Sequence, residues 1–345
     1  MPEPTRVTIL GTGQMGLCCA ALLHAGQQAR VTMWSHSAEE SGTLAQTRRS
    51  DRLPEFVLPA EVRVAMGDGE ALRGADLVVC AVPVQYMRGV WERLGASLPA
   101  GAGVVSVAKG IENGTLLRPT QVVADALARL GVDSPDSAPR PIGVLSGPTI
   151  AGELARCLPA TMIAASDDPG FSERVQGLFS TSWLRVYTNP DVLGVELAGA
   201  TKNIIAIAAG VIDGLRAGYN AKSALLARGL AEIARLGAAM GARPDTFFGI
   251  AGVGDLATSC FSPEGRNRSL GEALGKGETL DTYLAASRHV VEGVATTRSV
   301  VDLASKYRVE MPITQAVHAV LFEKVDPLDA IGGLMSRRLK GERVG

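Results

Sequence analysis

The sequence predicts an α/β fold in which a doubly wound N-terminal sheet is followed by an all-helical C-terminal domain. Three observations support this prediction. Short β-branched runs alternate with helical stretches in the first half of the chain, a Gly-x-Gly-x-x-Gly motif follows the first run, and the second half is rich in Ala, Leu and Gly. Alternating strands and helices are typical of a mainly parallel sheet with helices on both faces.

Seven short runs in this first half are predicted to be strands. They cover residues 7–10, 30–34, 77–82, 103–108, 142–146, 161–165 and 183–187. The sequence Asn189-Pro190-Asp191 then marks a break, because proline and Asx residues interrupt regular structure. We therefore expect one domain over residues 1–189 and a helical domain over residues 190–345.

The composition excludes several classes of function. The chain has 345 residues with 34 basic and 35 acidic side chains, so net charge gives no reason to expect nucleic acid or a membrane surface as the main partner. Its five cysteines show no Cys-x-x-Cys spacing, which favours free thiols in the cytoplasm. The four histidines lack metal-site spacing, and no apolar stretch is long enough to predict a membrane segment. We expect no metal.

The glycine motif predicts a dinucleotide site. Gly11, Gly13 and Gly16 lie between the first predicted strand and a helix that is expected to end near residue 25. The first glycine permits a tight turn, the second lets the backbone approach a pyrophosphate, and the third allows close helix packing. The helix N-terminus adds unpaired N–H groups and a positive dipole. These features indicate a Rossmann-like domain that binds NAD or NADP.

The choice between these two cofactors stays open. The second strand is followed by Ser35 and His36, where dinucleotide-binding proteins often carry an acidic residue for the ribose 2′-hydroxyl. Without that carboxylate, a 2′-phosphate is not repelled. NADPH is therefore as plausible as NADH.

A lysine in the second half is a candidate catalytic acid or base. Lys202 lies in an apolar run and is the sole basic residue between Arg185 and Arg216. Such a lysine either extends to water or lines a polar cavity, because burial of an unpaired ammonium costs several kcal/mol or lowers its pKa. Burial and a second cation such as Lys109 would lower this pKa, whereas a nearby Asp255 would raise it.

Four other segments combine turn residues with reactive side chains. Lys109 follows a predicted strand, and Ser146-Gly147-Pro148-Thr149 ends another, at the sheet edge where ligands bind in open α/β folds. Asp255 follows Gly252-Val253-Gly254, and Gly265-Arg266-Asn267-Arg268 offers guanidinium groups that suit a phosphate. Taken singly, each of these segments is better explained as a surface turn.

Taken in order, these motifs resemble those of the bacterial NAD(P)-dependent glycerol-3-phosphate dehydrogenases, from about Arg6 to Glu342. The resemblance rests on the following segments: Gly11 to Gly16, Val107 to Glu112, Ser146 to Pro148 with Ala151 and Glu153, Thr201 to Gly210, Gly254 to Leu256, Arg266 to Arg268, Val291 to Gly293, Met311 to Ile313 and Leu334 to Arg337. The resemblance implies reversible reduction of dihydroxyacetone phosphate to sn-glycerol 3-phosphate, which supplies glycerophospholipid synthesis.

The resemblance also implies roles for individual residues. Lys202 would be the general acid and base. The substrate would contact Lys109, Gly147, Thr149, Lys202, Asp255, Gly265, Arg266 and Asn267. The cofactor would contact Gly11, Gly13, Gln14, Met15, Gly16, His36, Lys109, Ala151, Arg266, Val290 and Glu292.

The chain departs from the family pattern at Gly265, where the family commonly has a serine. Its hydroxyl contact is then either lost or supplied by Ser262 or Ser269. Two alternatives to this enzyme are a related dehydrogenase of a hydroxy acid or another phosphorylated ketone, and a non-enzymatic module that senses NAD(P)H. A small-molecule substrate, a cytoplasmic location and a possible homodimer complete the expectations. The direction of flux and feedback regulation cannot be predicted.

Overall fold

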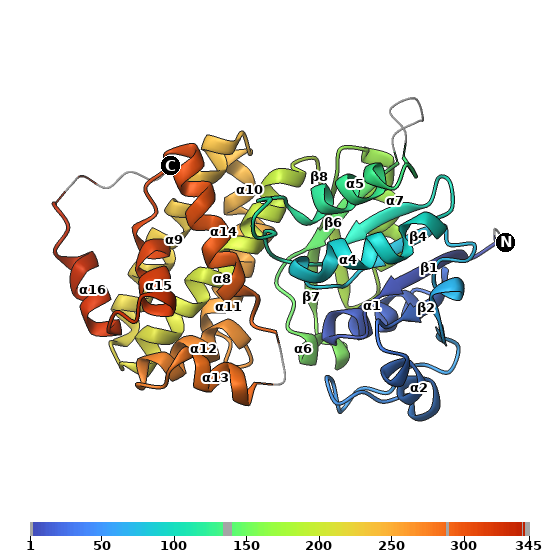
Figure 1. Ribbon diagram of the computed structural model, residues 1–345, viewed down its shortest axis with the longest axis horizontal. Helices are drawn as coiled ribbons and strands as arrows, with labels where there is room; N and C mark the ends of the chain where they lie inside the picture. Colours follow the sequence, from blue (N-terminus) through green and yellow to red (C-terminus); the bar gives the residue numbers. More distant parts are fainter. Residues whose placement is uncertain (1–2, 134–139, 288–289, 340, 342–345) are drawn as a thin grey trace. The chain divides into compact units, whose positions relative to one another are not determined.

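The computed structural model describes residues 3–133, 140–287, 290–339 and 341 (Figure 1). The chain forms two compact units. The first comprises Met1–Ala108 and Arg118–Val192, and the second comprises Lys109–Leu117 and Leu193–Gly345. The segment Lys109–Leu117 leaves the strand before it and joins the helical unit, an excursion that no local sequence signal indicates.

The first unit contains the doubly wound sheet. Its strands are β1 (Thr5–Leu10), β2 (Ala29–Trp34), β3 (Arg63–Val64), β4 (Leu77–Cys80), β5 (Gly103–Ser106), β6 (Ile142–Ser146), β7 (Ala160–Ser166) and β8 (Leu184–Asn189). They lie in the order β3-β2-β1-β4-β5-β6-β7-β8. Neighbours are parallel except β6 and β7, which are antiparallel. The predicted fold class is therefore confirmed, and β3 is the strand that the sequence did not predict, because two residues carry no periodicity.

The helices of this unit lie on both faces of the sheet (Figure 1). They are α1 (Gln14–Ala25), α2 (Ala38–Thr47), α3 (Asp68–Ala71), α4 (Val84–Leu94), α5 (Pro119–Arg129), α6 (Ala151–Ala155) and α7 (Pro169–Phe179), with a short 3₁₀ turn at Gly95–Ser97. Helix α4 packs with α5, whereas α1 packs with α6 and α7. Buried side chains such as Ile9 and Val79 fill the space between helices and sheet.

The strand order reverses beside β1, whose neighbours are β2 and β4. The backbone continues the ladder just beyond these strands, since the N–H of Gly11 donates to the carbonyl of Trp34 at 2.8 Å and that of Ala81 donates to the carbonyl of Leu10 at 2.8 Å. Open α/β sheets bind ligands at the carboxyl edge of such a reversal.

The second unit is helical. It contains α8 (Val192–Gly214), α9 (Gly218–Met240), α10 (Pro244–Phe248), a π-helical turn (Ile250–Gly254), α11 (Asp255–Phe261), α12 (Arg266–Gly275), α13 (Leu280–Ala286), α14 (Glu292–Tyr307), α15 (Pro312–Phe322) and α16 (Pro327–Met335). Among the described residues, α8 alone is long and apolar enough to cross a membrane, but 94% of its most apolar window is buried inside the protein. Helix α8 is thus the core helix of this unit.

Helices α8 and α12 pack backbone to backbone. A Cβ atom on Gly210 would lie 1.9 Å from the carbonyl oxygen of Arg268, and one on Gly271 would lie 1.9 Å from the carbonyl oxygen of Ile207. No side chain fits at either position. Two more glycines continue the contact at four-residue spacing, Gly214 and Gly275. The helix that carries Lys202 and the helix that begins at Arg266 are therefore held at close range.

Candidate active site

The glycine loop after β1 has the geometry that a dinucleotide requires. Gly11 has φ +110°, and a Cβ there would lie 2.8 Å from the carbonyl oxygen of Ala81. A Cβ on Gly16 would lie 2.1 Å from the carbonyl oxygen of Gly11, whereas one on Gly13 would meet nothing within 4 Å. The outer two glycines are thus required by packing, and the open side of Gly13 is left for a ligand.

Helix α1 begins directly after Gly13, and no side chain caps its N-terminus. Its first N–H groups suit a pyrophosphate, so the residues present fit NAD or NADP. Gln14 and Met15 are the first two residues of the helix and are half-buried. Cys18 is buried within the helix and its thiol lies 3.4 Å from the carbonyl oxygen of Ala151 on α6. Burial raises the pKa of Cys18 to about 12, which makes it a packing residue.

The edge beyond β2 is polar. Ser35 is buried, His36 is exposed, and the hydroxyl of Ser37 accepts a hydrogen bond from the N–H of Glu40 at the start of α2. The carbonyl of His36 accepts from Nη1 of Arg93 at 3.3 Å. Strand β2 ends at Trp34, as predicted from the sequence, so Ser35 and His36 directly follow it.

The second unit brings together two lysines and one carboxylate. Nζ of Lys202 donates to Oδ1 of Asp255 at 2.5 Å, and Nζ of Lys109 donates to Oδ2 of the same carboxylate at 2.6 Å. Asp255 is 1% exposed and Lys202 is 7% exposed. The alternative in which Lys202 extends to water is therefore wrong. Two ammonium groups around one carboxylate leave a local excess of positive charge, which suits an anion or a developing alkoxide.

The pKa of Lys202 is lowered to about 8, first by burial, with a further contribution from the positive charge of Lys109. Asp255 opposes this shift but does not overcome it. The sequence left open whether burial or Asp255 has the larger effect on the pKa of Lys202, and in the structure burial has the larger effect. A lysine with this pKa both donates and accepts protons near neutral pH.

The backbone before α11 positions the carboxylate. A Cβ on Gly252 would lie 2.0 Å from the carbonyl oxygen of Phe247, so only glycine permits this π-helical turn. Asp255 begins α11, and Ser259 follows one turn later on the same helix face. The hydroxyl of Ser259 lies 2.7 Å from Nζ of Lys202. Ser259 was not among the residues predicted from the sequence, although its spacing of four residues from Asp255 was a usable signal.

Arg266 and Asn267 form the first turn of α12. Nη1 of Arg266 donates to the carbonyl of Val290 at 2.9 Å, and Oδ1 of Asn267 accepts from the N–H of Gly293 at 3.0 Å. Arg266 is exposed. These bonds attach the start of α14 to the start of α12.

Glu292 lies among the cations of this unit. It is the first residue of α14, and burial raises its pKa, whereas Arg266, Lys109 and Lys202 each lower it. The Glu292 carboxyl group thus lies within the electrostatic field of all three predicted cations.

Of the remaining predicted residues, Gly147, Thr149 and Ala151 belong to the first unit and Gly265 to the second. Gly147 has φ +134°, and the hydroxyl of Thr149 donates to its carbonyl at 3.3 Å, in the turn between β6 and α6. Ala151 begins α6. At the Gly265 position, the N–H of Ser269 donates to the carbonyl of Gly265, and the hydroxyl of Ser262 accepts from the N–H of Glu264.

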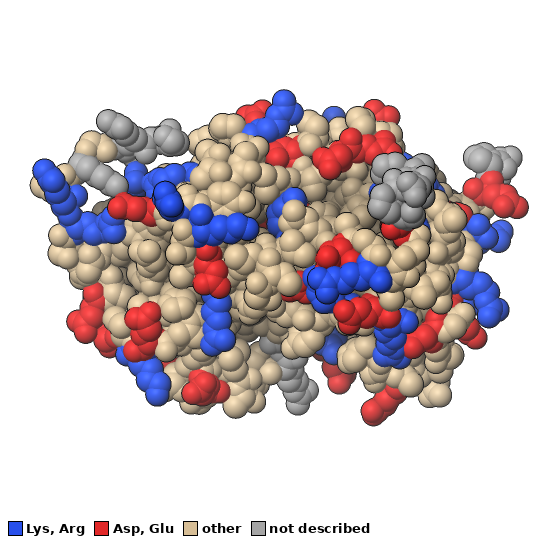
Figure 2. Space-filling view, turned by 45° about the horizontal axis from the view of Figure 1, so that its top comes forward, with Lys and Arg blue, Asp and Glu red and all other residues tan. Residues whose placement is uncertain are grey.

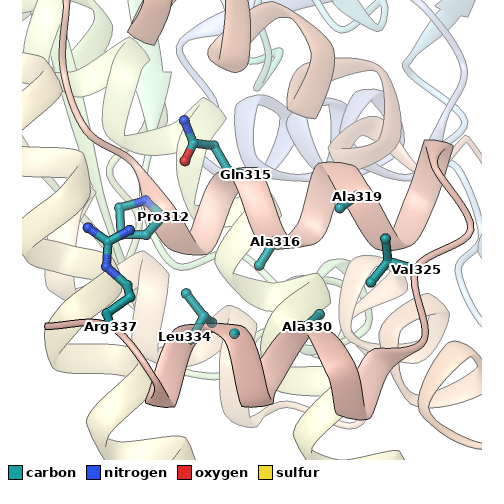
Figure 3. Close-up of a pocket in the computed structure, with 9 residues that line it drawn as sticks. Pro312, Gln315, Ala316, Ala319, Val325, Ala330, Leu334 and Arg337 are labelled. Carbon is teal, nitrogen blue, oxygen red and sulfur yellow. The ribbon is translucent and has the colours of Figure 1, made fainter.

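A separate groove of about 210 Å³ lies between α15 and α16 (Figure 3). Its lining includes Gln315, Ala319, Leu334 and Arg337 but none of the predicted site residues. Within the described residues, no group of three His, Cys, Asp or Glu side chains could hold a metal ion. On the face that Figure 2 shows, basic and acidic side chains are interspersed, in keeping with the net charge of −1.

A dinucleotide loop on a doubly wound sheet, together with a buried lysine of lowered pKa in a helical unit, defines the class of dinucleotide-dependent oxidoreductases. Two family profiles match the chain. They describe the N-terminus of NAD-dependent glycerol-3-phosphate dehydrogenase over residues 6–172 and its C-terminus over residues 191–332. This chain belongs to the NAD-dependent glycerol-3-phosphate dehydrogenase family.

Individual relatives agree with this assignment. The chain is 44% identical to glycerol-3-phosphate dehydrogenase [NAD(P)+] 1 of Salinibacter ruber, over 97% of this chain and 96% of the relative. It is also 44% identical to glycerol-3-phosphate dehydrogenase [NAD(P)+] 2 of Mycobacterium bovis, over 97% of this chain and 98% of the relative. The crystal structure of glycerol-3-phosphate dehydrogenase from Coxiella burnetii superimposes with a TM-score of 0.91 at 34% identity, covering 97% of this chain and 100% of that one.

Proposed function

We propose that this chain reduces dihydroxyacetone phosphate to sn-glycerol 3-phosphate with NADH or NADPH, and that it also catalyses the reverse oxidation. The observation that carries the proposal is the pair of ammonium groups on Asp255, with Lys202 at 2.5 Å and Lys109 at 2.6 Å. The product would supply glycerophospholipid synthesis.

Lys202 is the proposed general acid in the reduction. When bound, NADH or NADPH supplies the hydride that the ketone carbon receives. The ketone oxygen then gains negative charge, which the ammonium of Lys202 stabilises before it gives up its proton. Lys109 adds a second positive charge, and Asp255 keeps both ammonium groups in place. In the oxidation, the neutral amine of Lys202 accepts the hydroxyl proton instead.

Arg266 and Asn267 are the proposed phosphate ligands. A guanidinium binds phosphate through paired hydrogen bonds, and the N-terminus of α12 contributes N–H groups and a positive dipole. Phosphate binding at this position would orient the carbonyl group, so it would contribute to turnover as well as to affinity. Gly147, Thr149 and Gly265 complete the proposed set of substrate contacts.

We propose that residues 1–189 bind the dinucleotide and that residues 190–345 provide substrate binding and catalysis. The cofactor contacts proposed for the first part are Gly11, Gly13, Gln14, Met15, Gly16, His36 and Ala151. Those proposed for the second part are Arg266, Val290 and Glu292. Lys109, which lies in the first range by sequence, packs with the helical unit and is proposed to touch both ligands.

Two further properties are proposed. None of the five cysteines forms a disulfide, which supports a cytoplasmic location, and cell fractionation would test it. Exposed apolar side chains on and after α16, with Leu328 at 62% and Met335 at 79% exposure, support a homodimer. Light scattering on the purified chain would test that assembly.

The test of the activity is oxidation of NADH and of NADPH by the purified chain, with dihydroxyacetone phosphate compared against dihydroxyacetone, other phosphorylated ketones and keto acids. Selective turnover of dihydroxyacetone phosphate is expected. Faster turnover of another ketone would reassign the substrate. If the folded chain binds the cofactor but none of the tested ketones supports cofactor oxidation, the proposed reaction is contradicted.

A further inference from the structure

A partly buried hydrogen-bond network connects the glycine loop to the edge beyond β2. Its centre is the carboxylate of Glu40 on α2. Oε2 of Glu40 accepts from the hydroxyl of Thr12 at 2.8 Å and from that of Ser35 at 2.5 Å. Oε1 accepts from Nε and Nη2 of Arg52 at 2.9 and 2.7 Å. One carboxylate therefore holds three segments of the first unit together.

The network lies where doubly wound folds bind the adenosine ribose. Thr12 stands between the first two glycines of the loop, and Ser35 directly follows β2. In this fold, an acidic residue near the end of the second strand accepts a hydrogen bond from the ribose 2′-hydroxyl. Glu40 supplies a carboxylate to this region from five residues further along the chain.

The hydrogen bonds of Glu40 determine what this carboxylate can do. An ionised carboxylate offers about four lone-pair positions to donors. Thr12, Ser35 and Arg52 already provide four donor contacts. A ribose hydroxyl would have to displace one of them, so Glu40 is poorly suited to the role that favours NADH.

Arg52, in contrast, retains binding capacity. A guanidinium has five N–H donors, and Glu40 occupies two of them. Within the described part of the chain, the other three make no hydrogen bond. The side chain is 39% exposed, so a ligand in solvent can reach it.

A second arginine flanks the same edge. Nε of Arg93 donates to Asp68 at 2.5 Å, its Nη1 donates to the carbonyl of His36 at 3.3 Å, and its guanidinium lies 5.2 Å from the ring centre of Trp34. The region beyond β2 is therefore bordered by two guanidinium groups, each with a carboxylate partner.

We propose that Arg52, held in place by Glu40, binds the 2′-phosphate of NADPH, so that this chain prefers NADPH to NADH. This proposal concerns cofactor binding and not the reaction. It rests on the proposed function in one respect, which is that the cofactor is NAD or NADP. Paired hydrogen bonds from a guanidinium to a phosphate are among the strong contacts in proteins. Glu40 is a positioning residue in this scheme.

Direct binding tests the proposal without any substrate. Calorimetric titration of the full chain with adenosine 2′,5′-bisphosphate and with 5′-AMP compares ligands that differ in the 2′-phosphate. The wild type is expected to bind the bisphosphate more tightly by about tenfold or more, since hydrogen bonds to charged groups are stronger than neutral ones. Arg52→Gln should weaken bisphosphate binding by about ten- to a hundredfold and change AMP binding by less than about threefold.

Arg49→Gln is the matched control, because Arg49 is exposed in the same segment and donates to the carbonyl of Pro54 at 3.2 Å, with no bond to Glu40. It should leave both affinities unchanged. Arg52→Lys should restore part of the bisphosphate affinity. Equal affinity of the wild type for the bisphosphate and for 5′-AMP would overturn the proposal. The proposal would also be overturned if Arg52→Gln lost the same affinity for both ligands.

The outcome is separable from that of the proposed reaction. Bisphosphate selectivity without turnover of dihydroxyacetone phosphate would retain Arg52 as the phosphate ligand and reject the reaction. Turnover with NADH and NADPH at equal efficiency, together with no bisphosphate selectivity, would retain the reaction and reject the role of Arg52.

Discussion

Lys202 and Asp255 form a buried ion pair, with Nζ and Oδ1 2.5 Å apart, although 53 residues separate them in the chain. Lys109 occupies the second oxygen of the same carboxylate. The pair is therefore one part of a three-residue cluster with a net positive charge, and the chemistry proposed for this family member depends on that excess.

Lys202→Ala should lower the turnover number for dihydroxyacetone phosphate by at least about a hundredfold, as expected for loss of a general acid. Binding of NADH, followed by fluorescence, should stay within a factor of about two, because the change lies outside the glycine loop. Lys276→Ala is the control, since the side chain of Lys276, at the C-terminal end of α12, is 62% exposed. Near-normal turnover in Lys202→Ala would remove this lysine from the mechanism.

The pH dependence of the two directions should be opposite. The pKa of Lys202 is about 8, so the rate of reduction should fall as the pH rises through this value, because the ammonium form is lost. The rate of oxidation should rise over the same range. Asp255→Asn removes the charge that stabilises the ammonium, so the midpoint for reduction should move to lower pH. Initial rates from pH 6 to 10 would measure this, with Asp245→Asn at an exposed position as the control.

Arg266→Ala should raise the Michaelis constant for dihydroxyacetone phosphate by about ten- to a hundredfold, the range expected for a charged hydrogen bond. The constant for dihydroxyacetone, which has no phosphate, should change much less. Steady-state kinetics with both substrates would measure the difference. Equal changes for the two substrates would count against a phosphate ligand at this position.

Gly271→Ala should destabilise the protein by about 1–3 kcal/mol, because the new methyl group overpacks the contact between α8 and α12. Its Cβ would lie 1.9 Å from the carbonyl oxygen of Ile207. Gly332→Ala on α16 is the matched control, since a Cβ there meets nothing within 4 Å. That control should be neutral or stabilising by up to about 1 kcal/mol through helix propensity. Thermal unfolding of Gly271→Ala and Gly332→Ala would test this prediction. Equal changes in melting temperature for the two variants would contradict it.

Glu232 should make stability depend on pH. Its buried carboxyl accepts from the N–H groups of Ile313 and Thr314 at the start of α15, and burial raises its pKa to about 7. The folded state therefore holds a proton that the unfolded state has released above pH 4.5. The contribution of this group to stability should fall by about 3 kcal/mol between pH 4.5 and 7 and then level off.

Glu232→Gln removes this titration. The difference in free energy of unfolding between the variant and the wild type should thus shift in favour of the variant as the pH rises from 5 to 7.5. Urea unfolding at both pH values would measure it. A difference that does not change with pH would show that Glu232 stays ionised in the folded state.

The order of the elements could be predicted from the sequence because its signals are local. The β-branched runs, the glycine motif and the change to an Ala-rich pattern after Asn189 each depend on neighbouring residues. Gly11 and Gly16 were predicted with the correct physical role, since steric limits on a turn act within a few residues. Strand β3 was missed because two residues carry no pattern.

The sequence alone determined the family, the fold class and the residue types available for chemistry. Only the tertiary structure decided which side chains meet. Lys109 reaches Asp255 across 146 residues, and Ser259 lies beside Lys202 through the packing of α8 with α11. The pKa of Lys202 and the saturation of Glu40 by three partners follow from burial and contact. These quantities depend on distance in space, which the order of residues along a chain does not specify.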